Sequence, residues 1–221
     1  MKILYEDKYL LVCEKPIGVS SQKSDGGEDM LSLLEGYRKE RGEDGYVGLV
    51  HRLDTATGGA MIYSKRKEVT GKLCELLQTE AYKKQYLAVV EGRPESERGE
   101  LCDLLYHDKQ KNKSFVVNKK RTGVKEARAT YGLLDSKTLE DGRVISLVSV
   151  TLITGRTHQI RVQFASRKMP LLGDGKYGSR DNGTTLALWS HRVTFEHPVT
   201  RKTVTVQSDP PATYPWDMFK I

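Results

Sequence analysis

Long apolar runs and paired cysteines are both absent from this sequence of 221 residues. No apolar run approaches the roughly 18 residues that a membrane-spanning helix requires. The N-terminus lacks the apolar segment of a signal peptide and runs directly into Glu6 and Asp7. There is no Walker loop, and no glycine motif is followed by a dinucleotide-binding pattern of strands and helices. We therefore expect a cytoplasmic protein that does not enter a membrane.

Metal and disulfide chemistry also have little support. The three cysteines, Cys13, Cys74 and Cys102, are widely spaced and form no Cys-x-x-Cys pair, which argues against a disulfide framework or a zinc ribbon. We interpret them as buried or incidental thiols. His51 and His158 have no carboxylate neighbours at ligand spacing. We expect both to hydrogen-bond the backbone and shape their loops, and we predict no metal and no cofactor.

Positive charge is concentrated in one stretch of a chain whose formal net charge is +7. Residues 107–128 contain eight Lys or Arg against Asp108 and Glu126, whereas residues 1–45 are acidic overall. A local block of positive charge suits contact with a polyanion such as RNA. It is equally compatible with a solubilising loop that has no partner, and charge alone leaves both interpretations open.

Short β-branched and apolar runs alternate with turn residues along most of the chain. Strands are expected at residues 3–5, 9–13, 60–64, 81–92, 101–106, 114–117, 127–134, 144–152, 186–189, 193–195 and 203–206. Helices are expected after an N-cap at Asp29, over residues 67–79, and after an N-cap at Thr157. Many strands and few helices, without regular βαβ alternation, predict the α+β class with a largely antiparallel sheet. No change in composition marks a second domain, so we predict a single domain over residues 1–221, and no partner helix argues against a monomer.

The stretch from Val50 to Gly59 combines a His, an Arg, an Asp and two glycines. An Asp beside an Arg at a glycine turn suits a carboxylate that a cationic neighbour keeps charged. Taken alone, the same stretch also fits a charged surface loop that leads into a strand.

Three separated segments, taken together, resemble the RluA-type pseudouridine synthases, which isomerise uridine in RNA. The first is His51-Arg52-Leu53-Asp54 followed by Thr57-Gly58-Gly59, and the second is Lys84-Gln85-Tyr86. The third is Gly155 to Arg161, followed in the glycine-rich loop by Pro170-Leu171-Leu172-Gly173-Asp174 and Tyr177-Gly178. The turn Lys15-Pro16-Ile17-Gly18 also matches the family pattern. The resemblance spans nearly the whole chain in the family's order. It implies the pseudouridine synthase catalytic fold, with a central sheet, a few flanking helices and an active-site cleft across the sheet.

The resemblance also implies a role for individual residues. Asp54 is expected to be the essential carboxylate, Arg161 its cationic partner, and Tyr86 the ring that stacks on the target base. Arg52 is expected to fill the space that the flipped base leaves, or to hold a phosphate. The other cations assigned to RNA binding are Lys119, Lys120, Arg121 and Arg156.

Two features differ from the family pattern. Gly58 stands where the family usually has Ser, so a hydrogen bond near Asp54 could differ. The extra N-terminal RNA-binding domain of many relatives is not expected here, because residues 1–20 already match the start of the catalytic domain.

Two other functions remain open. A noncatalytic RNA-binding or RNA-remodelling protein would keep the fold and the basic surface. A sugar hydrolase would use Asp54 and Asp174 as paired carboxylates, although Asp174 more simply fixes its glycine-rich loop. Neither the RNA, ribosomal or transfer, nor the modified uridine follows from the sequence.

Overall fold

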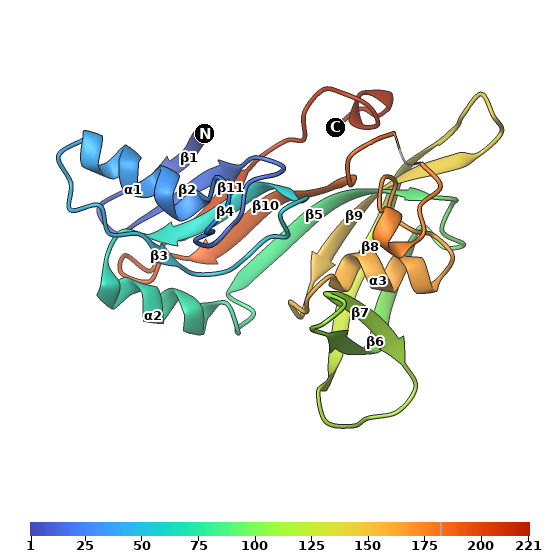
Figure 1. The fold of residues 1–221 in the computed structure, drawn as a ribbon, viewed down its shortest axis with the longest axis horizontal. Helices are drawn as coiled ribbons and strands as arrows, with labels where there is room; N and C mark the ends of the chain where they lie inside the picture. The colour runs from blue at the N-terminus through green and yellow to red at the C-terminus, as the bar shows by residue number, and fades with distance from the viewer. Residues whose placement is uncertain (182) are drawn as a thin grey trace. The chain divides into compact units, whose positions relative to one another are not determined.

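Two strands, β5 (Tyr82–Glu91) and β10 (Leu188–Glu196), carry the chain from one structural unit to the other. The computed structural model describes residues 1–181 and 183–221. Unit 1 contains Met1–Lys84 and Trp189–Pro210, and unit 2 contains Gln85–Leu188 and Pro211–Ile221. The single domain over residues 1–221 stays a prediction, and each unit is described by itself (Figure 1).

Apolar strands build the sheet of unit 1, in which the strand order is β1-β2-β4-β10. Two short strands complete it, because β3 pairs with β4 and β11 pairs with β10. All seven residues of β4 are buried. The β4–β10 pairing is parallel, whereas β1–β2, β2–β4 and β10–β11 are antiparallel. Besides β10, the strands are β1 (Lys2–Glu6), β2 (Leu10–Lys15), β3 (Gly48–Leu49), β4 (Gly58–Ser64) and β11 (Thr203–Gln207).

Two helices belong to unit 1, α1 (Met30–Glu40) and α2 (Lys67–Leu76). The carboxylate of Asp29 accepts a hydrogen bond of 2.8 Å from the Ser32 amide, so the predicted N-cap is confirmed. Helix α2 packs on β3 and β4 and buries an apolar stripe. The helix ends at Leu76, three residues before the predicted end at Thr79, and a turn follows Leu76.

A buried ion network ties α1 to the end of β4. The Arg38 side chain, 2% exposed, lies 2.7 Å from Glu43 and 2.9 Å from Asp44. Lys65 reaches Glu6 at 2.7 Å and Glu43 at 3.1 Å. Burial alone would raise the pKa of Glu6, but hydrogen bonds from Lys65 and Tyr37 outweigh it, and the pKa lies below its usual 4.5. The charged form of Glu6 therefore stabilises the folded state.

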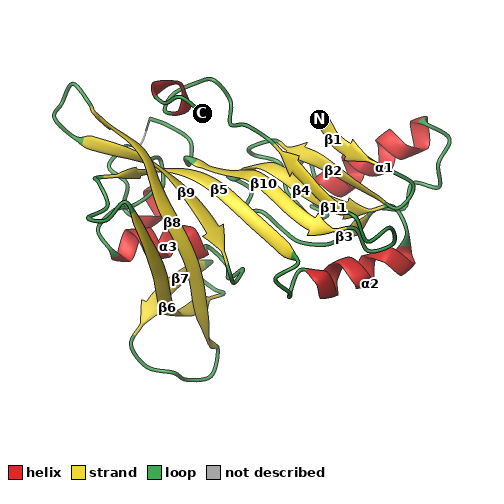
Figure 2. Cartoon of the chain, turned by 180° about the vertical axis from the view of Figure 1, so that it is seen from behind, coloured by secondary structure: helices red, strands yellow, loops and turns green. Residues whose placement is uncertain are grey.

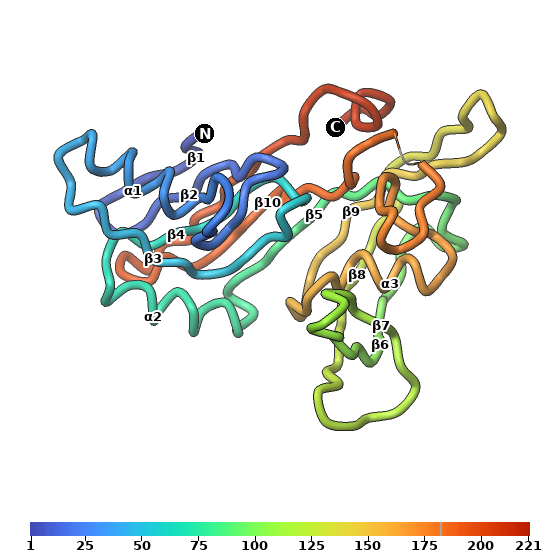
Figure 3. Tube along the Cα trace, viewed as in Figure 1, coloured from blue at the N-terminus to red at the C-terminus, as the bar shows by residue number. Residues whose placement is uncertain are grey.

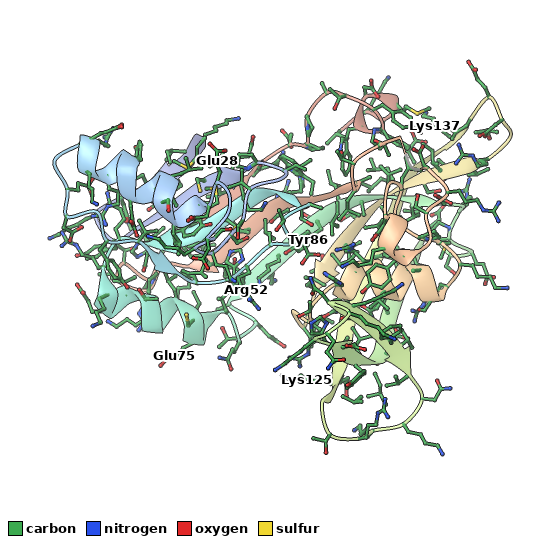
Figure 4. The ribbon with its side chains drawn as sticks, viewed as in Figure 1. Glu28, Arg52, Glu75, Tyr86, Lys125 and Lys137 are labelled. Carbon is green, nitrogen blue, oxygen red and sulfur yellow. The ribbon has the colours of Figure 1, made fainter. Side chains whose placement is uncertain are left out.

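We expect Glu6→Gln to destabilise the protein in a pH-dependent way. A lowered folded-state pKa contributes stability that is complete above pH 4.5 and is lost as the pH falls through the folded-state value. The variant should therefore unfold about 1–2 kcal/mol more easily at pH 7, with the difference shrinking toward zero in acid. Urea unfolding between pH 7 and pH 3.5 measures this. Glu75→Gln, at an exposed position on α2 (Figure 4), is the control; a pH-independent difference for Glu6→Gln would contradict the assignment.

The second unit is also built on a sheet, with the strand order β5-β9-β8-β6-β7. Adjacent strands from β9 to β7 pair antiparallel. Helix α3 (Gln159–Ser166) packs on β6 and β7, where Leu105, Ala127 and Val162 form a buried cluster. The further elements are β6 (Arg98–Asp108), β7 (Lys113–Val117), β8 (Val124–Thr138), β9 (Val144–Leu152) and the 3-10 turns η1 (Gly175–Tyr177) and η2 (Trp216–Met218).

The predicted fold class is confirmed, since the strands are mostly antiparallel and the helices few. The N-cap predicted at Thr157 is wrong. His158 occupies that position in the left-handed region, at φ 54°, without a capping hydrogen bond from its side chain. Instead, the Gln159 side-chain oxygen accepts from the Arg156 amide at 3.0 Å, so a glutamine satisfies an amide near the start of the helix. Within the described residues, no helix is both long and apolar enough to span a membrane.

Candidate active site

The loop that carries Asp54 is fixed in unit 1 by a serine from a distant segment. The Ser21 hydroxyl donates to the Leu53 carbonyl at 2.7 Å and accepts from the Leu53 amide at 3.0 Å. The Asp54 carbonyl accepts from the Thr57 amide at 2.9 Å, which closes a turn directly after the carboxylate. All three hydrogen bonds involve backbone atoms of the loop, and together they fix the position of Asp54. It is half-buried.

A fully buried lysine lies under the same loop. The Lys15 ammonium donates to the carbonyls of Pro16 at 2.9 Å, Val19 at 2.7 Å and Thr55 at 3.2 Å. These three acceptors match the three donors of an ammonium group. Burial lowers the pKa of Lys15 to about 8, and the negative charge of Asp54 opposes that shift. Lys15 thus joins the Lys-Pro turn to the residue that follows Asp54, a role that the sequence did not reveal.

His51 is a neutral hydrogen-bond acceptor. Its Nε2 atom accepts from the Ile62 amide at 3.2 Å, as expected of a histidine that bonds the backbone, and the Tyr82 hydroxyl lies 3.2 Å from the same atom. Burial and the nearby Lys84 hold the pKa of His51 well below its usual range. The imidazole therefore anchors the start of the loop to β4 in its uncharged form.

The glycine that departs from the family pattern is explained by a tryptophan. A Cβ atom on Gly58 would lie 2.2 Å from the ring of Trp189, which pairs with it across β4 and β10. Trp189 is buried, and its Nε1 donates to the Ser208 carbonyl at 3.0 Å. The indole thus occupies the space that a serine side chain would need.

We expect Gly58→Ser, which restores the family's usual residue, to lower stability by about 2 kcal/mol through overpacking. The melting temperature should fall by roughly 4–8 °C. A double-mutant cycle with Trp189→Leu should show a favourable coupling of about 1 kcal/mol, because the smaller side chain gives the serine room. Gly26→Ser, at a position with open space around its Cβ, is the control. An unchanged melting temperature for Gly58→Ser would mean that the indole moves aside freely.

In unit 2, Arg161 makes a two-bond ion pair with Asp174. Nε lies 2.7 Å from one carboxylate oxygen and Nη2 lies 2.8 Å from the other, and both residues are buried. Asp174 also holds its own loop, because its carbonyl accepts from the amides of Tyr177 and Ser179. A buried carboxylate in a bidentate pair is poorly placed to be the second acid of a hydrolase. The geometry therefore supports the loop-fixing role of Asp174.

Asp54 belongs to unit 1 and Arg161 to unit 2, and their predicted pairing stays a prediction. Asp174 uses the edge of the guanidinium formed by Nε and Nη2. The Asp174 pair also fixes the plane of the guanidinium, which is what a preorganised cationic site requires.

Tyr86 is a buried residue of β5, 6% exposed, and Figure 4 shows its side chain on that strand. A second tyrosine, Tyr177, was not among the predicted site residues. The Tyr177 hydroxyl accepts from the Ser114 amide at 2.8 Å and lies 3.0 Å from Nδ1 of His158. His158 was expected to hydrogen-bond the backbone, but its Nδ1 atom contacts a side chain instead. The Arg161 guanidinium lies 5.1 Å from the Tyr177 ring. Only its place in the glycine-rich loop could have drawn attention to Tyr177.

The predicted RNA-binding cations are all exposed. Arg52 donates to the Gln22 side chain at 3.1 Å in unit 1, and Figure 4 shows it on the loop. In unit 2, Arg156 donates to the Glu126 carbonyl at 2.9 Å. The remaining three lie in or beside the loop between β7 and β8, which extends from the sheet in Figure 3: Lys119, Lys120 and Arg121.

The three cysteines differ in how far they are exposed. Cys13 is buried, Cys74 is half-buried, and Cys102 is exposed, so burial applies fully to only one of the three. Across residues 1–181 and 183–221, no group of three or more His, Cys, Asp or Glu side chains is arranged to hold a metal ion.

Comparison with known proteins points to one family. Residues 9–166 match the family model described as RNA pseudouridylate synthase. A ribosomal large subunit pseudouridine synthase C of Buchnera aphidicola is 33% identical over 92% of this chain and 65% of that protein. A Bacillus subtilis protein named uncharacterized RNA pseudouridine synthase YhcT is 31% identical over 96% of this chain and 69% of that protein. The chain thus spans about two thirds of the length of these relatives.

Solved structures agree on the fold. The human protein RNA Pseudouridylate Synthase Domain Containing 4 has a TM-score of 0.77 and 24% identity, over 95% of this chain and 88% of that one. RNA Pseudouridylate Synthase Domain Containing 1, also human, has a TM-score of 0.78 and 22% identity, over 98% and 86% of the two chains. These likenesses support the α+β architecture.

Proposed function

Because this chain belongs to the RNA pseudouridylate synthase family, we propose that it isomerises uridine in RNA to pseudouridine. The observation that carries the proposal is the family match over residues 9–166, which includes Asp54, Tyr86 and Arg161. Support also comes from the loop of Asp54, because the side chains of Ser21 and Lys15 form hydrogen bonds with its backbone. Such fixed positioning is a requirement of catalysis by a single carboxylate.

The reaction exchanges one bond of the base for another. The N1–C1′ bond breaks, the uracil turns, and C5 joins C1′ while the hydrogen on C5 leaves as a proton and N1 gains one. We propose that Asp54 assists this exchange as a carboxylate, by attack on C1′ or C6 or by stabilising a glycal. Arg161 would keep the carboxylate charged, and Tyr86 would stack on the flipped base. Neither redox change nor a cofactor is needed.

The RNA that we propose is ribosomal. Several relatives at 30–35% identity are named for the large ribosomal subunit. Transfer RNA is the other RNA to test, because related enzymes differ in the RNA shapes that their loops contact. We also propose that the chain acts as a monomer.

Tritium release tests the activity directly. Transcripts labelled with tritium at C5 of uridine lose the label to water only when C5 joins C1′. We expect release from ribosomal RNA that rises with enzyme and time, and a carbodiimide primer-extension stop at the modified position. No release from ribosomal or transfer RNA, with RNA binding still measurable, would favour a noncatalytic RNA-binding protein.

We expect the basic loop to contribute to RNA affinity through counterion release. Replacing Lys119 and Lys120 by Ala should weaken binding and reduce the slope of log K against log salt by about 1.5. Filter binding at several salt concentrations measures the slope. The matched control replaces the exposed lysines of α2, Lys67 and Lys72. Equal slopes for the two double variants would remove the loop from the RNA interface.

A further inference from the structure

The sheet formed by β6, β7 and β8 has two different faces. One face packs against α3 through Leu105 and Ala127, which are buried. Side chains alternate between the two faces along a strand. Their neighbours in sequence therefore point to the opposite side, which we call the outer face. Figure 2 shows β6, β7 and β8 from that side, and no helix of the described chain lies over them.

The outer face carries an apolar patch at the end of the sheet beside the basic loop. Tyr106 is directly opposite Phe115 on one neighbouring strand and Val124 on the other. Directly opposite residues of an antiparallel pair lie on the same face, about 5 Å apart. Leu104 and Val117 form the next pair along the strands. Phe115 is 37% exposed, and the other four are half-buried. The accessible Phe115 ring and its half-buried apolar neighbours are therefore in a position to contact a partner.

Cations lie on the two aromatic rings of the patch. The guanidinium carbon of Arg121 is 5.0 Å from the centroid of the Tyr106 ring. The Lys113 ammonium is 5.9 Å from the Phe115 ring, but it donates to the Lys176 carbonyl at 2.5 Å and lies closer, at 5.1 Å, to the Tyr177 ring. Arg128, opposite Cys102 on the same face, is also exposed. The surrounding residues 107–128 hold eight Lys or Arg against two acidic residues. Glu126, directly opposite Leu104, places one exposed carboxylate on the same face. The patch is therefore aromatic at its centre, with Arg121 of the basic loop lying over one of its rings.

Aromatic rings bordered by cations suit unpaired nucleotides, because bases stack on the rings while cations meet the phosphates. A cross-strand aromatic pair that served only the hairpin would need neither the exposed ring nor the excess of positive charge. We propose that the outer face binds a single-stranded segment of the RNA, with one base stacked on Phe115 and phosphates near Arg121. The proposal rests on the proposed function for its RNA, and it uses the face of the sheet opposite α3.

The test measures binding of a 12-nucleotide single-stranded RNA of mixed sequence that carries one 2-aminopurine. Phe115→Ala should weaken binding roughly 5- to 150-fold, the range for loss of one stacked base. Phe115→Leu keeps the packing but not the stacking, so it should weaken binding while leaving the melting temperature nearly unchanged. Phe115→Trp should bind within about twofold of the original protein, because tryptophan also stacks. The 2-aminopurine quenching should be lost in the Ala and Leu variants and kept in the Trp variant.

The matched control is Leu134→Ala, at an apolar residue of β8 that is 56% exposed, and it should bind as the original protein does. Binding within twofold for folded Phe115→Leu would overturn the proposal. A dimer that Phe115→Leu abolishes, with RNA affinity unchanged, would also overturn it and assign the patch to a second copy of the chain. Tritium release is measured in parallel. Its absence, with stacking on Phe115 still observed, would reject the isomerase but not the RNA platform.

Discussion

Asp54→Asn should abolish turnover and leave the folded protein intact. We expect tritium release to fall by about 10⁴-fold or more, as happens when the central group of a catalytic site is removed. Asparagine has nearly the same shape as aspartate but no charge, so it can neither act as a nucleophile nor stabilise developing positive charge. The melting temperature and the RNA dissociation constant should change little.

The reason to expect an intact fold lies in the hydrogen bonds of the loop. Ser21 holds the Leu53 backbone, and the turn after Asp54 is closed by the Asp54 carbonyl and the Thr57 amide. None of these bonds uses the Asp54 side chain. Loss of the Asp54 charge should affect Lys15, however, because that charge raises the pKa of the buried Lys15 ammonium. In the variant the pKa of Lys15 should therefore fall further below about 8.

Asp25→Asn is the matched control, since Asp25 is an exposed acidic residue of the same unit. It should keep full activity. Single-turnover tritium release with excess enzyme separates a loss of chemistry from a loss of affinity. If Asp54→Asn released tritium at the original rate, the carboxylate would not be essential and the proposed mechanism would be wrong.

Local signals in the sequence predicted much of the fold. The β-branched run Val144–Leu152 is a strand with the predicted bounds, because such side chains favour a strand in any context that buries them. The start of α1 was also predictable, since Asp29 caps amides that are only a few residues away. The cap of α3 was not, because His158 takes the N-cap position in the left-handed region without a side-chain cap, and the Gln159 side chain accepts from the Arg156 amide.

Local sequence patterns did not predict the contacts that fix the candidate site. Resemblance identified Asp54, but the residues that fix its loop come from distant segments. Lys15 reaches Thr55 across 40 positions, and Ser21 reaches Leu53 across 32. No local pattern distinguishes a lysine that three carbonyls will surround from one that faces water. The same holds for Gly58, whose missing side chain is explained only by Trp189 on another strand. Pairings between Asp54, Tyr86 and Arg161 stay predictions.

Gly59→Ala should be the most destabilising single-methyl substitution among the glycines of this loop. Gly59 has φ +112°, a conformation that side chains rarely adopt. An added Cβ would lie 2.3 Å from the carbonyl oxygen and 2.7 Å from the amide nitrogen of Ser190. Unlike a flexible side chain, this backbone cannot move without breaking the parallel pairing of β4 with β10. We expect a loss of about 4 kcal/mol from strain and overpacking combined.

Thermal unfolding and urea titration measure the effect, with an expected fall in melting temperature of roughly 8–16 °C. Gly71→Ala supplies a control of opposite sign, because Gly71 lies within α2 with nothing near its Cβ. Alanine there should stabilise the helix by about 0.5–1 kcal/mol. Equal melting temperatures for the two variants would mean that β4 and β10 can separate at Gly59 without cost. The loop of Asp54 would then lack a rigid base, since Thr57 and Gly58 connect it directly to this glycine.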